Sequence, residues 1–288
     1  MKISNKLKTF IVMISFFYSI NVFRILFDIL NMNRQLICNK AILYVDAANS
    51  LITIVVFLFL YKDFIYEHLN KTFLKSKITR IATEILIGFG IFFGVKYVSA
   101  IVESTIFTLF NIKDVTVANQ ASIENLVHYG KFIMFISLAV LAPFVEEFVF
   151  RGAFKEGIKN KKVFIAVSGL IFGLMHVMSD YTVLFGIFFA GLYLDYIFEK
   201  KSGKSRVWSS LAGVLLISLI VCGILYLNYG NLLILIKNLD LVEVIGSITY
   251  VTMGIFLAYY YAKHENIFIN IGLHSLNNIF SYVVLLLI

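Results

Sequence analysis

The chain contains few of the residues that stabilise small secreted domains or solvate a soluble protein. Of its 288 residues, two are cysteines, one is a proline and 15% are charged. Cys38 and Cys222 have no metal-binding or redox spacing, so the sequence predicts neither a disulfide framework nor a cysteine metal site. A soluble domain carries about a quarter charged residues, so the shortage of charge argues against an ordinary soluble globular protein.

Apolar residues take the place of the missing charges. Hydrophobic residues make up 60% of the chain, its mean hydropathy is +0.89, and long apolar runs recur from end to end. These runs are continuous rather than alternating with a period of two, which favours helices over the strands of a transmembrane barrel. The sequence therefore predicts an all-α, polytopic transmembrane helical bundle in a cell membrane.

The apolar runs predict about eight to nine membrane spans, within a range of seven to nine. Each run is near the roughly 20 residues that a helix needs to cross the hydrocarbon core. Most of the 25 Lys and Arg residues fall on one side of these spans when the N-terminus is placed in the cytoplasm. We therefore interpret the net charge of +8 as this positive-inside pattern and not as a nucleic-acid surface. The candidate spans are residues 9–30, 42–61, 81–102, 131–154, 162–179, 182–198, 207–228, 244–262 and 267–287.

The ionisable residues with the least favourable setting lie in the apolar stretch 142–152. Glu146, Glu147 and Arg151 occur there, and ionisable groups are costly inside a membrane segment, so they indicate a functional site. Glu147 and Arg151 are four residues apart and can pair along a helix, whereas Glu146 points about 100° away. Helical phase thus leaves Glu146 free to face a cavity. Pro143 either kinks the helix and frees backbone groups at the site or is a neutral irregularity.

Two later spans hold further polar residues at comparable depth. His176 lies near the end of one span, and His274, Asn277 and Asn278 lie in the last. His274 and Asn278 are four residues apart and project from one face of a helix, whereas Asn277 is expected to point away from that face. Counted from the cytoplasmic ends, His176 fits this depth least well, which predicts that its helix is tilted, short or starts early.

These residue types suit hydrolysis of an amide bond at membrane depth. A glutamate beside one or two histidines can activate water as a general base, and a histidine or an asparagine can donate hydrogen bonds to the developing oxyanion. Two histidines and one glutamate can also hold zinc with an open coordination position. No HExxH motif is present, so the sequence permits zinc without indicating it, and we expect no cofactor.

Three motifs occur in a fixed order on separate predicted spans. Together they resemble the CPBP family of CAAX proteases and bacteriocin-processing enzymes, also called the Abi family. The resemblance implies an all-helical intramembrane fold and a glutamate-type endopeptidase activity. The motifs are Glu146-Glu147-x-x-x-Arg151, Phe172-x-x-x-His176 and His274-x-x-x-Asn278.

The resemblance also implies a role for each motif residue. Glu146 would activate the attacking water, with His176 near it. His274 and Asn278 would form the pair that stabilises the oxyanion. The residues implied to support the site are Glu147, Arg151 and Phe172, with Arg151 structural rather than catalytic.

The resemblance covers the second half of the chain, and the predicted protease core is 81–288. Residues 1–80 carry no motif and are predicted to form transmembrane helices and a basic cytoplasmic loop. The first apolar run has no small-residue cleavage site, so we expect it to be retained. His176 and His274 are 98 residues apart, farther than is usual in the family, which predicts a two-helix insertion at about 180–243.

The expected function is hydrolysis of a peptide bond in a membrane-associated peptide or protein, in peptide or bacteriocin maturation or in self-immunity. The expected partners are this substrate and the lipid bilayer, with no nucleic acid, and no oligomeric state is predicted. Two alternatives stay open: a non-catalytic membrane immunity or scaffolding protein with the same fold, and a CAAX-type prenyl protein endopeptidase. The abundance of Ile, Lys, Asn and Phe favours a bacterial source, hence the cytoplasmic membrane, and weakens the prenyl alternative.

Overall fold

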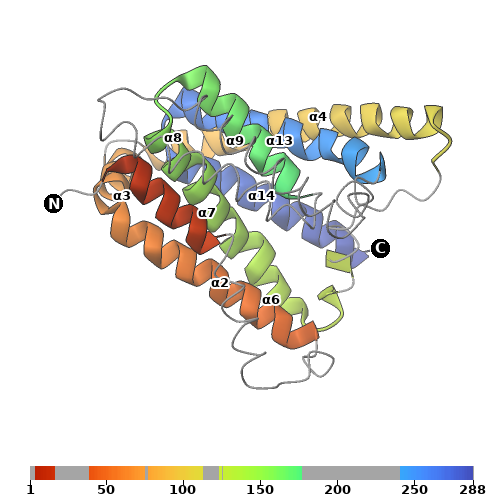
Figure 1. Cartoon of the computed structure of the whole chain (residues 1–288), viewed down its shortest axis with the longest axis horizontal. Helices are drawn as coiled ribbons and strands as arrows, with labels where there is room; N and C mark the ends of the chain where they lie inside the picture. Colours follow the sequence, from red (N-terminus) through yellow and green to blue (C-terminus); the bar gives the residue numbers. More distant parts are fainter. Residues whose placement is uncertain are drawn as a thin grey trace, which may run out of the picture.

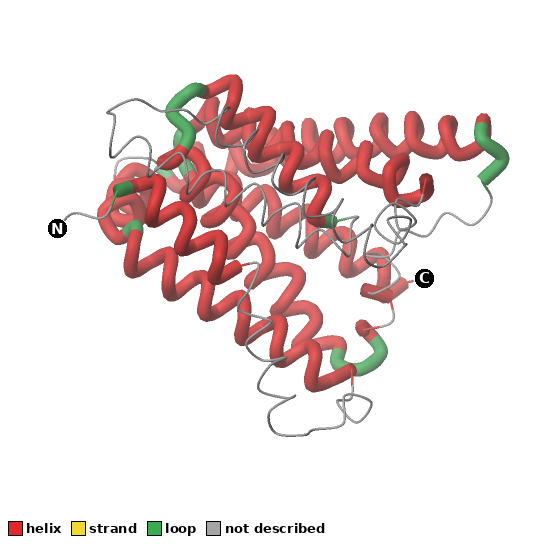
Figure 2. Tube along the Cα trace, in the orientation of Figure 1, coloured by secondary structure: helices red, strands yellow, loops and turns green. Residues whose placement is uncertain are grey.

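The computed structural model of this chain is helical throughout its described parts (Figure 1). It describes residues 4–16, 39–74, 77–112, 123–124, 126–176 and 241–287. Within these ranges every regular element is a helix, and short loops join them, as Figure 2 shows. The structure therefore confirms the predicted all-α class.

The described helices range from a single turn to 32 residues. One covers residues 5–16. The others are α2 (Asn39–Leu60), α3 (Lys62–Leu69), α4 (Ile78–Leu109), α6 (Lys131–Phe135), α7 (Ala142–Glu147), α8 (Phe154–Gly157), α9 (Lys161–Met175), α13 (Leu241–His264) and α14 (Ile267–Leu287).

The helices α6, α7 and α8 form one continuous rod, Lys131–Gly157, which carries the glutamate pair. Two π-helical segments, Ile136–Leu141 and Phe148–Ala153, lie between its α-helical parts. The rod contacts α2 and α14, and Figure 1 shows it crossing the molecule beside α2. A π-helical turn rotates the side chains that follow it, and such turns are frequent at functional sites.

Five described helices are long and apolar enough to cross a membrane. They coincide with five of the predicted spans, and the helix predicted at 81–102 extends to Leu109. The predicted spans 182–198 and 207–228 lie outside the described residues, as do most of 9–30 and the insertion predicted at 180–243. The five helices are Leu43–Leu60, Ile78–Leu109, Lys131–Gly157, Val244–His264 and Ile267–Leu287.

The structure describes the span predicted at 162–179 as far as His176, and residues 177–179 lie outside the described residues. The helix found there, α9, has 15 residues, which is about 22 Å at the α-helical rise and less than the roughly 30 Å of hydrocarbon. It starts where the Asn160 side chain accepts hydrogen bonds from the backbone N–H groups of Lys162 and Val163, as an N-cap does. Its C-cap residue is His176, which places this histidine at the end of the helix.

Aromatic side chains fill the core beside the glutamate rod. Phe57 of α2 stacks on Phe148 with ring centroids 4.5 Å apart, and Phe150 packs edge-on against Phe172 of α9 at 5.6 Å. Other large apolar side chains point outward, for example Phe132, which is 79% exposed. A large exposed apolar surface is unfavourable in water and favourable in lipid, so this outward pattern agrees with a membrane protein.

Candidate active site

The rod gives Glu146 and Glu147 different surroundings. The Glu147 carboxylate is fully buried, and its Oε2 lies 3.3 Å from Nε of Arg151, which is also fully buried. Glu146 lies one residue earlier and lines a cavity of about 660 Å³. The structure thus confirms the division that helical phase predicts, with Glu147 paired along the helix and Glu146 facing the cavity.

Arg151 is held by groups from three helices. Besides Glu147, its Nη2 donates to the backbone carbonyl of Gly254 in α13 at 3.2 Å, and its guanidinium carbon lies 4.5 Å from the ring centre of Phe172. A buried guanidinium needs such partners, since an unpaired charge in the interior is costly. These contacts give Arg151 and Phe172 a part in joining the rod, α9 and α13.

Glu147 also binds the histidine of the last motif. His274 Nδ1–H donates to Glu147 Oε1 at 3.0 Å, and Asn270 donates through Nδ2 to Glu147 Oε2 at 3.2 Å and to the Leu257 carbonyl at 2.8 Å. Because a carboxylate accepts and cannot donate, this bond fixes the proton of neutral His274 on Nδ1. Nε2 of His274 is then the atom that faces Glu146.

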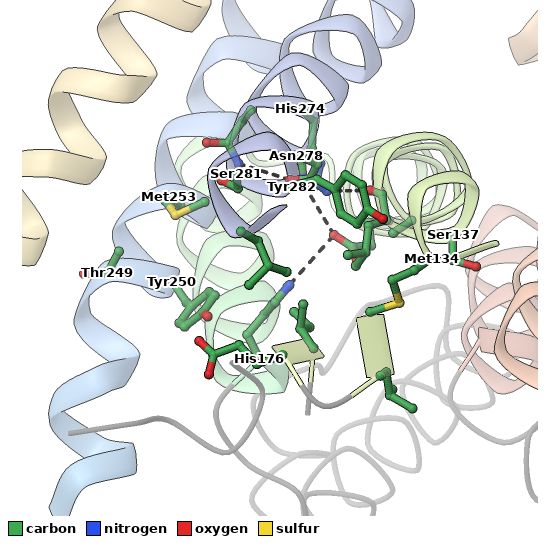
Figure 3. A pocket seen from close by; sticks show the side chains of 18 of the residues that line it. Met134, Ser137, His176, Thr249, Tyr250, Met253, His274, Asn278, Ser281 and Tyr282 are labelled. Carbon is green, nitrogen blue, oxygen red and sulfur yellow. Dashed lines mark hydrogen bonds and ion pairs between the residues drawn. The ribbon is translucent and has the colours of Figure 1, made fainter. Parts of the chain in front are cut away.

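Glu146 lies between two imidazole rings from different helices. Its Oε2 is 3.7 Å from His274 Nε2 and 4.0 Å from His176 Nε2, and it makes no hydrogen bond with the described residues. Figure 3 shows His176 and His274 reaching into the same pocket. Separations of this size exceed a direct hydrogen bond and suit one small molecule, such as a water, bound between the groups.

His176 is oriented by its own helix and by α13. Its Nδ1–H donates to the Phe172 carbonyl at 2.7 Å, so in the neutral ring Nε2 is the unprotonated nitrogen. Its ring stacks on Tyr250 of α13 with centroids 5.0 Å apart. The ring therefore presents Nε2 to Glu146 in a defined orientation.

The close contact between α9 and α13 depends on glycines (Figure 1). A Cβ atom on Gly169 would lie 2.7 Å from the Ile255 backbone, and one on Gly173 would overlap the backbone of Val251. These two glycines are four residues apart, which is the small-residue spacing of closely packed membrane helices. The approach brings the end of α9, and with it His176, toward the site.

Asn278 is tied to a carbonyl that Pro143 leaves free. In the π-helical segment the Ala142 N–H donates to Ser137, five residues earlier. The next bond in this pattern would run from residue 143 to Leu138, but proline has no N–H. The Leu138 carbonyl instead accepts from Asn278 Nδ2 at 2.9 Å, which agrees with the part of the first interpretation of Pro143 that it frees a backbone group at the site.

Asn277 projects about 100° around α14 from Asn278, as its position in the helix predicts, and still reaches the cavity. Asn277 and Asn278 both line the cavity, and Asn277 Nδ2 donates to Asn278 Oδ1 at 3.1 Å. The cavity is broad enough to reach side chains about 100° apart on α14. Lys96 of α4 also lines the cavity and donates to Asn277 Oδ1 at 3.5 Å and to Ser281 Oγ at 3.1 Å.

Glu146 Oε2 and the two histidines beside it are the ligands that a zinc ion would need at this site. Two ligands of a tetrahedral zinc at about 2.1 Å lie about 3.4 Å apart, slightly less than the separations between Glu146 and the two histidines. Within the described residues, no group of three or more His, Cys, Asp or Glu meets the geometry of a metal site.

A match to a protein-family model shows which family this chain belongs to. A family model described as "Type II CAAX prenyl endopeptidase Rce1-like" matches residues 128–212 and 202–280. These residues include the three motifs and make up more than half of the chain. This chain belongs to the CPBP family. The Rce1-like group of the CPBP family consists of proteases, and with the five apolar helices this identifies a membrane protein.

One curated relative of this chain comes from a mycoplasma. It is an uncharacterized protein of Mycoplasma capricolum subsp. capricolum, 29% identical over 177 residues, which are 59% of this chain and 52% of the relative. The chain thus spans about half the length of that relative. No solved structure matches this chain.

Sequence reasoning missed several residues that complete the site of this CPBP protein. Asn270 continues the four-residue spacing of His274 and Asn278 along α14, a signal that the sequence does contain. The spacing of Gly169 and Gly173 is a second such signal. Nothing in the sequence indicates that Tyr250 would lie against His176, because the two residues are on different helices.

Proposed function

We propose that this protein is an intramembrane endopeptidase that hydrolyses a peptide bond in a membrane-associated peptide or protein. The observation that carries the proposal is the position of Glu146 Oε2 between His274 Nε2 at 3.7 Å and His176 Nε2 at 4.0 Å. A carboxylate with two imidazoles beside a cavity is a set that can bind and deprotonate one water molecule.

In the proposed reaction, Glu146 takes a proton from the water, and the hydroxide attacks the carbonyl carbon of the scissile bond. The carbonyl oxygen becomes an oxyanion. The second N–H of Asn278 Nδ2, which the Leu138 carbonyl does not use, is available to donate to it. Glu146 then returns its proton to the amide nitrogen as the C–N bond breaks, which yields one carboxylic acid and one amine.

The supporting residues hold this arrangement. Glu147 accepts a hydrogen bond from Nδ1–H of His274, so Nε2 of this ring faces the reacting groups. Asn270 and Arg151 in turn hold the Glu147 carboxylate in position. His176 is positioned by its bond to Phe172 and by Tyr250. Side chains that such hydrogen bonds already hold in the right orientation need little rearrangement during the reaction.

The test is cleavage by purified protein reconstituted in liposomes. Glu146→Gln is expected to lower kcat at least about 100-fold, as loss of a general base does. His176→Ala and His274→Ala, which remove the imidazoles beside Glu146 Oε2, are expected to lower kcat as well. Glu84→Gln is the matched control, because Glu84 lies 3.6 Å from His264 in a different pocket. Undiminished cleavage by Glu146→Gln would rule out the proposed base.

We also propose that the reaction needs no metal. Incubation with a zinc chelator such as 1,10-phenanthroline is then expected to leave the cleavage rate unchanged. Inactivation by the chelator, with recovery on adding zinc, would instead assign Glu146, His176 and His274 as zinc ligands.

The family resemblance supports a role in maturing a peptide or bacteriocin or in self-immunity, with the protein in the bacterial cytoplasmic membrane. A second candidate is CAAX-type processing, which the description of the matching family favours. Cleavage of a farnesylated peptide together with inertness toward its unlipidated and palmitoylated forms would select this candidate. A non-catalytic immunity protein would instead protect cells fully with Glu146→Gln in place.

A further inference from the structure

We infer that a small pocket at one end of the helical bundle binds the phosphate group of an anionic membrane phospholipid. The pocket has a volume of about 130 Å³ and shares no lining residue with the cavity that holds Glu146. Its walls come from the starts of α4 and α14, the end of α13 and Lys71 of the π-helical turn Asn70–Leu74. The inference goes beyond the proposed peptidase function and does not depend on it.

The pocket lies where the ends of three membrane helices meet. Arg80 is the third residue of the apolar helix that starts at Ile78, His264 ends the helix before the last, and Ile269 lies in the first turn of α14. The headgroup layer of a bilayer begins where its apolar helices end. The phosphate group of a neighbouring lipid therefore lies at the depth of this pocket.

The chain that leads into α4 combines positive charge with exposed apolar side chains. Residues 71–80 include four basic residues and no acidic one. In the same segment Leu74 is 79% exposed and Ile78 is 71% exposed. Basic residues next to a membrane helix attract anionic lipids, and apolar side chains among them can enter the boundary of the acyl chains. This combination favours a lipid phosphate over a soluble anion.

Two side chains bring positive charge to the pocket. The Lys71 ammonium is fixed at the end of α13, where it donates to the carbonyls of His264 at 3.3 Å and Glu265 at 2.8 Å. Arg80 is exposed, and its guanidinium makes no hydrogen bond or ion pair with any residue that the structure describes. A guanidinium can bind two phosphate oxygens at once through its planar fork of N–H groups.

Glu84 is the carboxylate among the described residues that line the pocket, and an imidazole lies beside it. Its Oε2 is 3.6 Å from His264 Nδ1. Nε2 of the same ring is buried without a hydrogen-bond partner in the described part of the chain, whereas buried polar atoms normally have one. Nε2–H of a protonated ring can donate to a phosphate oxygen. His264 thus balances Glu84, and the charges of Lys71 and Arg80 remain for an anion.

The experiment compares two lipids that differ in headgroup charge. The purified full-length protein in detergent is titrated with phosphatidylglycerol or with phosphatidylcholine of the same acyl chains, and bound lipids are counted by native mass spectrometry. We expect one phosphatidylglycerol to bind at least about 10-fold more tightly than phosphatidylcholine, the range of one charge-assisted hydrogen bond. A large excess of inorganic phosphate should leave this lipid bound, because phosphate has no acyl chains to bury.

Variants assign this preference to the pocket. Arg80→Gln is expected to abolish the preference, and Arg80→Lys to keep part of it because the charge is retained without the planar fork. Lys161→Gln is the matched control, because Lys161 is exposed at the start of α9, lies outside the pocket and is on the same predicted side of the membrane. Thermal unfolding without added lipid should be the same for Arg80→Gln and the parent protein, which separates lost binding from misfolding.

Three results would overturn the assignment. The first is equal affinity for the two lipids, including no binding of either. The second is a preference for phosphatidylglycerol that survives in Arg80→Gln, which would place the lipid elsewhere. The third is displacement of the lipid by inorganic phosphate, which would assign the pocket to a soluble phosphate compound. None of these measurements uses cleavage, so each outcome leaves the proposed peptidase function to its own test.

Discussion

At the scale of single residues, the two adjacent glutamates make different contacts. Glu147 is fully buried and bound to Arg151, His274 and Asn270, so its loss would disturb the packing of the rod against α14. Glu146 faces the cavity, where its Oε2 lies 3.7 Å from His274 Nε2 and 4.0 Å from His176 Nε2. A stability measurement and an activity measurement should therefore respond differently to the two positions.

We expect Glu147→Gln to destabilise the protein and Glu146→Gln to leave its stability nearly unchanged. Removing the Glu147 charge leaves the Arg151 guanidinium buried without its counter-charge, a loss that costs about 3–5 kcal/mol. Thermal unfolding in detergent, followed by loss of the monodisperse chromatographic peak, measures this. Equal melting temperatures for the two variants would contradict the separation of roles.

At the scale of secondary-structure elements, the irregularities of the rod position the site. The π-helical segment and Pro143 together release the Leu138 carbonyl, which binds Asn278 of α14. The glycines of α9 let that helix approach α13 and bring His176 toward Glu146. Both features are backbone effects, so they can be tested at positions that contribute no catalytic side chain.

Pro143→Ala restores an N–H that can compete for the Leu138 carbonyl. We expect the protein to remain folded and to gain stability, since alanine is the better helix former. Activity should fall about 10-fold because Asn278 loses its fixed orientation. Measuring kcat together with the melting temperature checks both parts, and an unchanged kcat would show that the Leu138 bond is not needed.

Gly173→Ala is expected to destabilise the protein and to reduce activity. The added methyl group would overlap the Val251 backbone, so α9 and α13 must separate, at about 1–3 kcal/mol for an overpacked contact. Gly94→Ala is the matched control on a membrane helix, because nothing lies within 4 Å of its Cβ position. Similar melting temperatures for both variants would mean that α9 adjusts without cost.

At the scale of the whole molecule, helices distant in sequence enclose one cavity within a membrane protein. Residues of α2, α4, the rod, α9, α13 and α14 contribute to its lining. The large apolar side chains on the outside, with few charges among them, match a lipid environment. The orientation in that membrane stays a prediction from the distribution of Lys and Arg.

The predicted orientation places the loop before α4 inside the cell and the loop after it outside. In a variant with Cys38 and Cys222 replaced by serine, a cysteine at Ser76 should resist a membrane-impermeant maleimide in intact cells. A cysteine at Ser122 should react with it. The reverse labelling would invert the topology, and lysed cells provide the control that both thiols are reactive.

Local sequence determined the membrane class, the helices and the separation of Glu146 from Glu147. Apolar runs of about 20 residues and a spacing of four residues depend only on the chain near each position. The three motifs also identify the candidate site residues, because Glu146, His176, His274 and Asn278 line the same cavity.

Only the tertiary structure decided which groups meet. The bond of His274 to Glu147, the bond of Asn278 to Leu138 and the contact of Lys96 with Ser281 each join helices far apart in the sequence. Such contacts depend on how closely the helices approach and how they are rotated, which helical period alone does not set. The sequence thus identified the candidate site residues, and the packing of the helices determined their orientation.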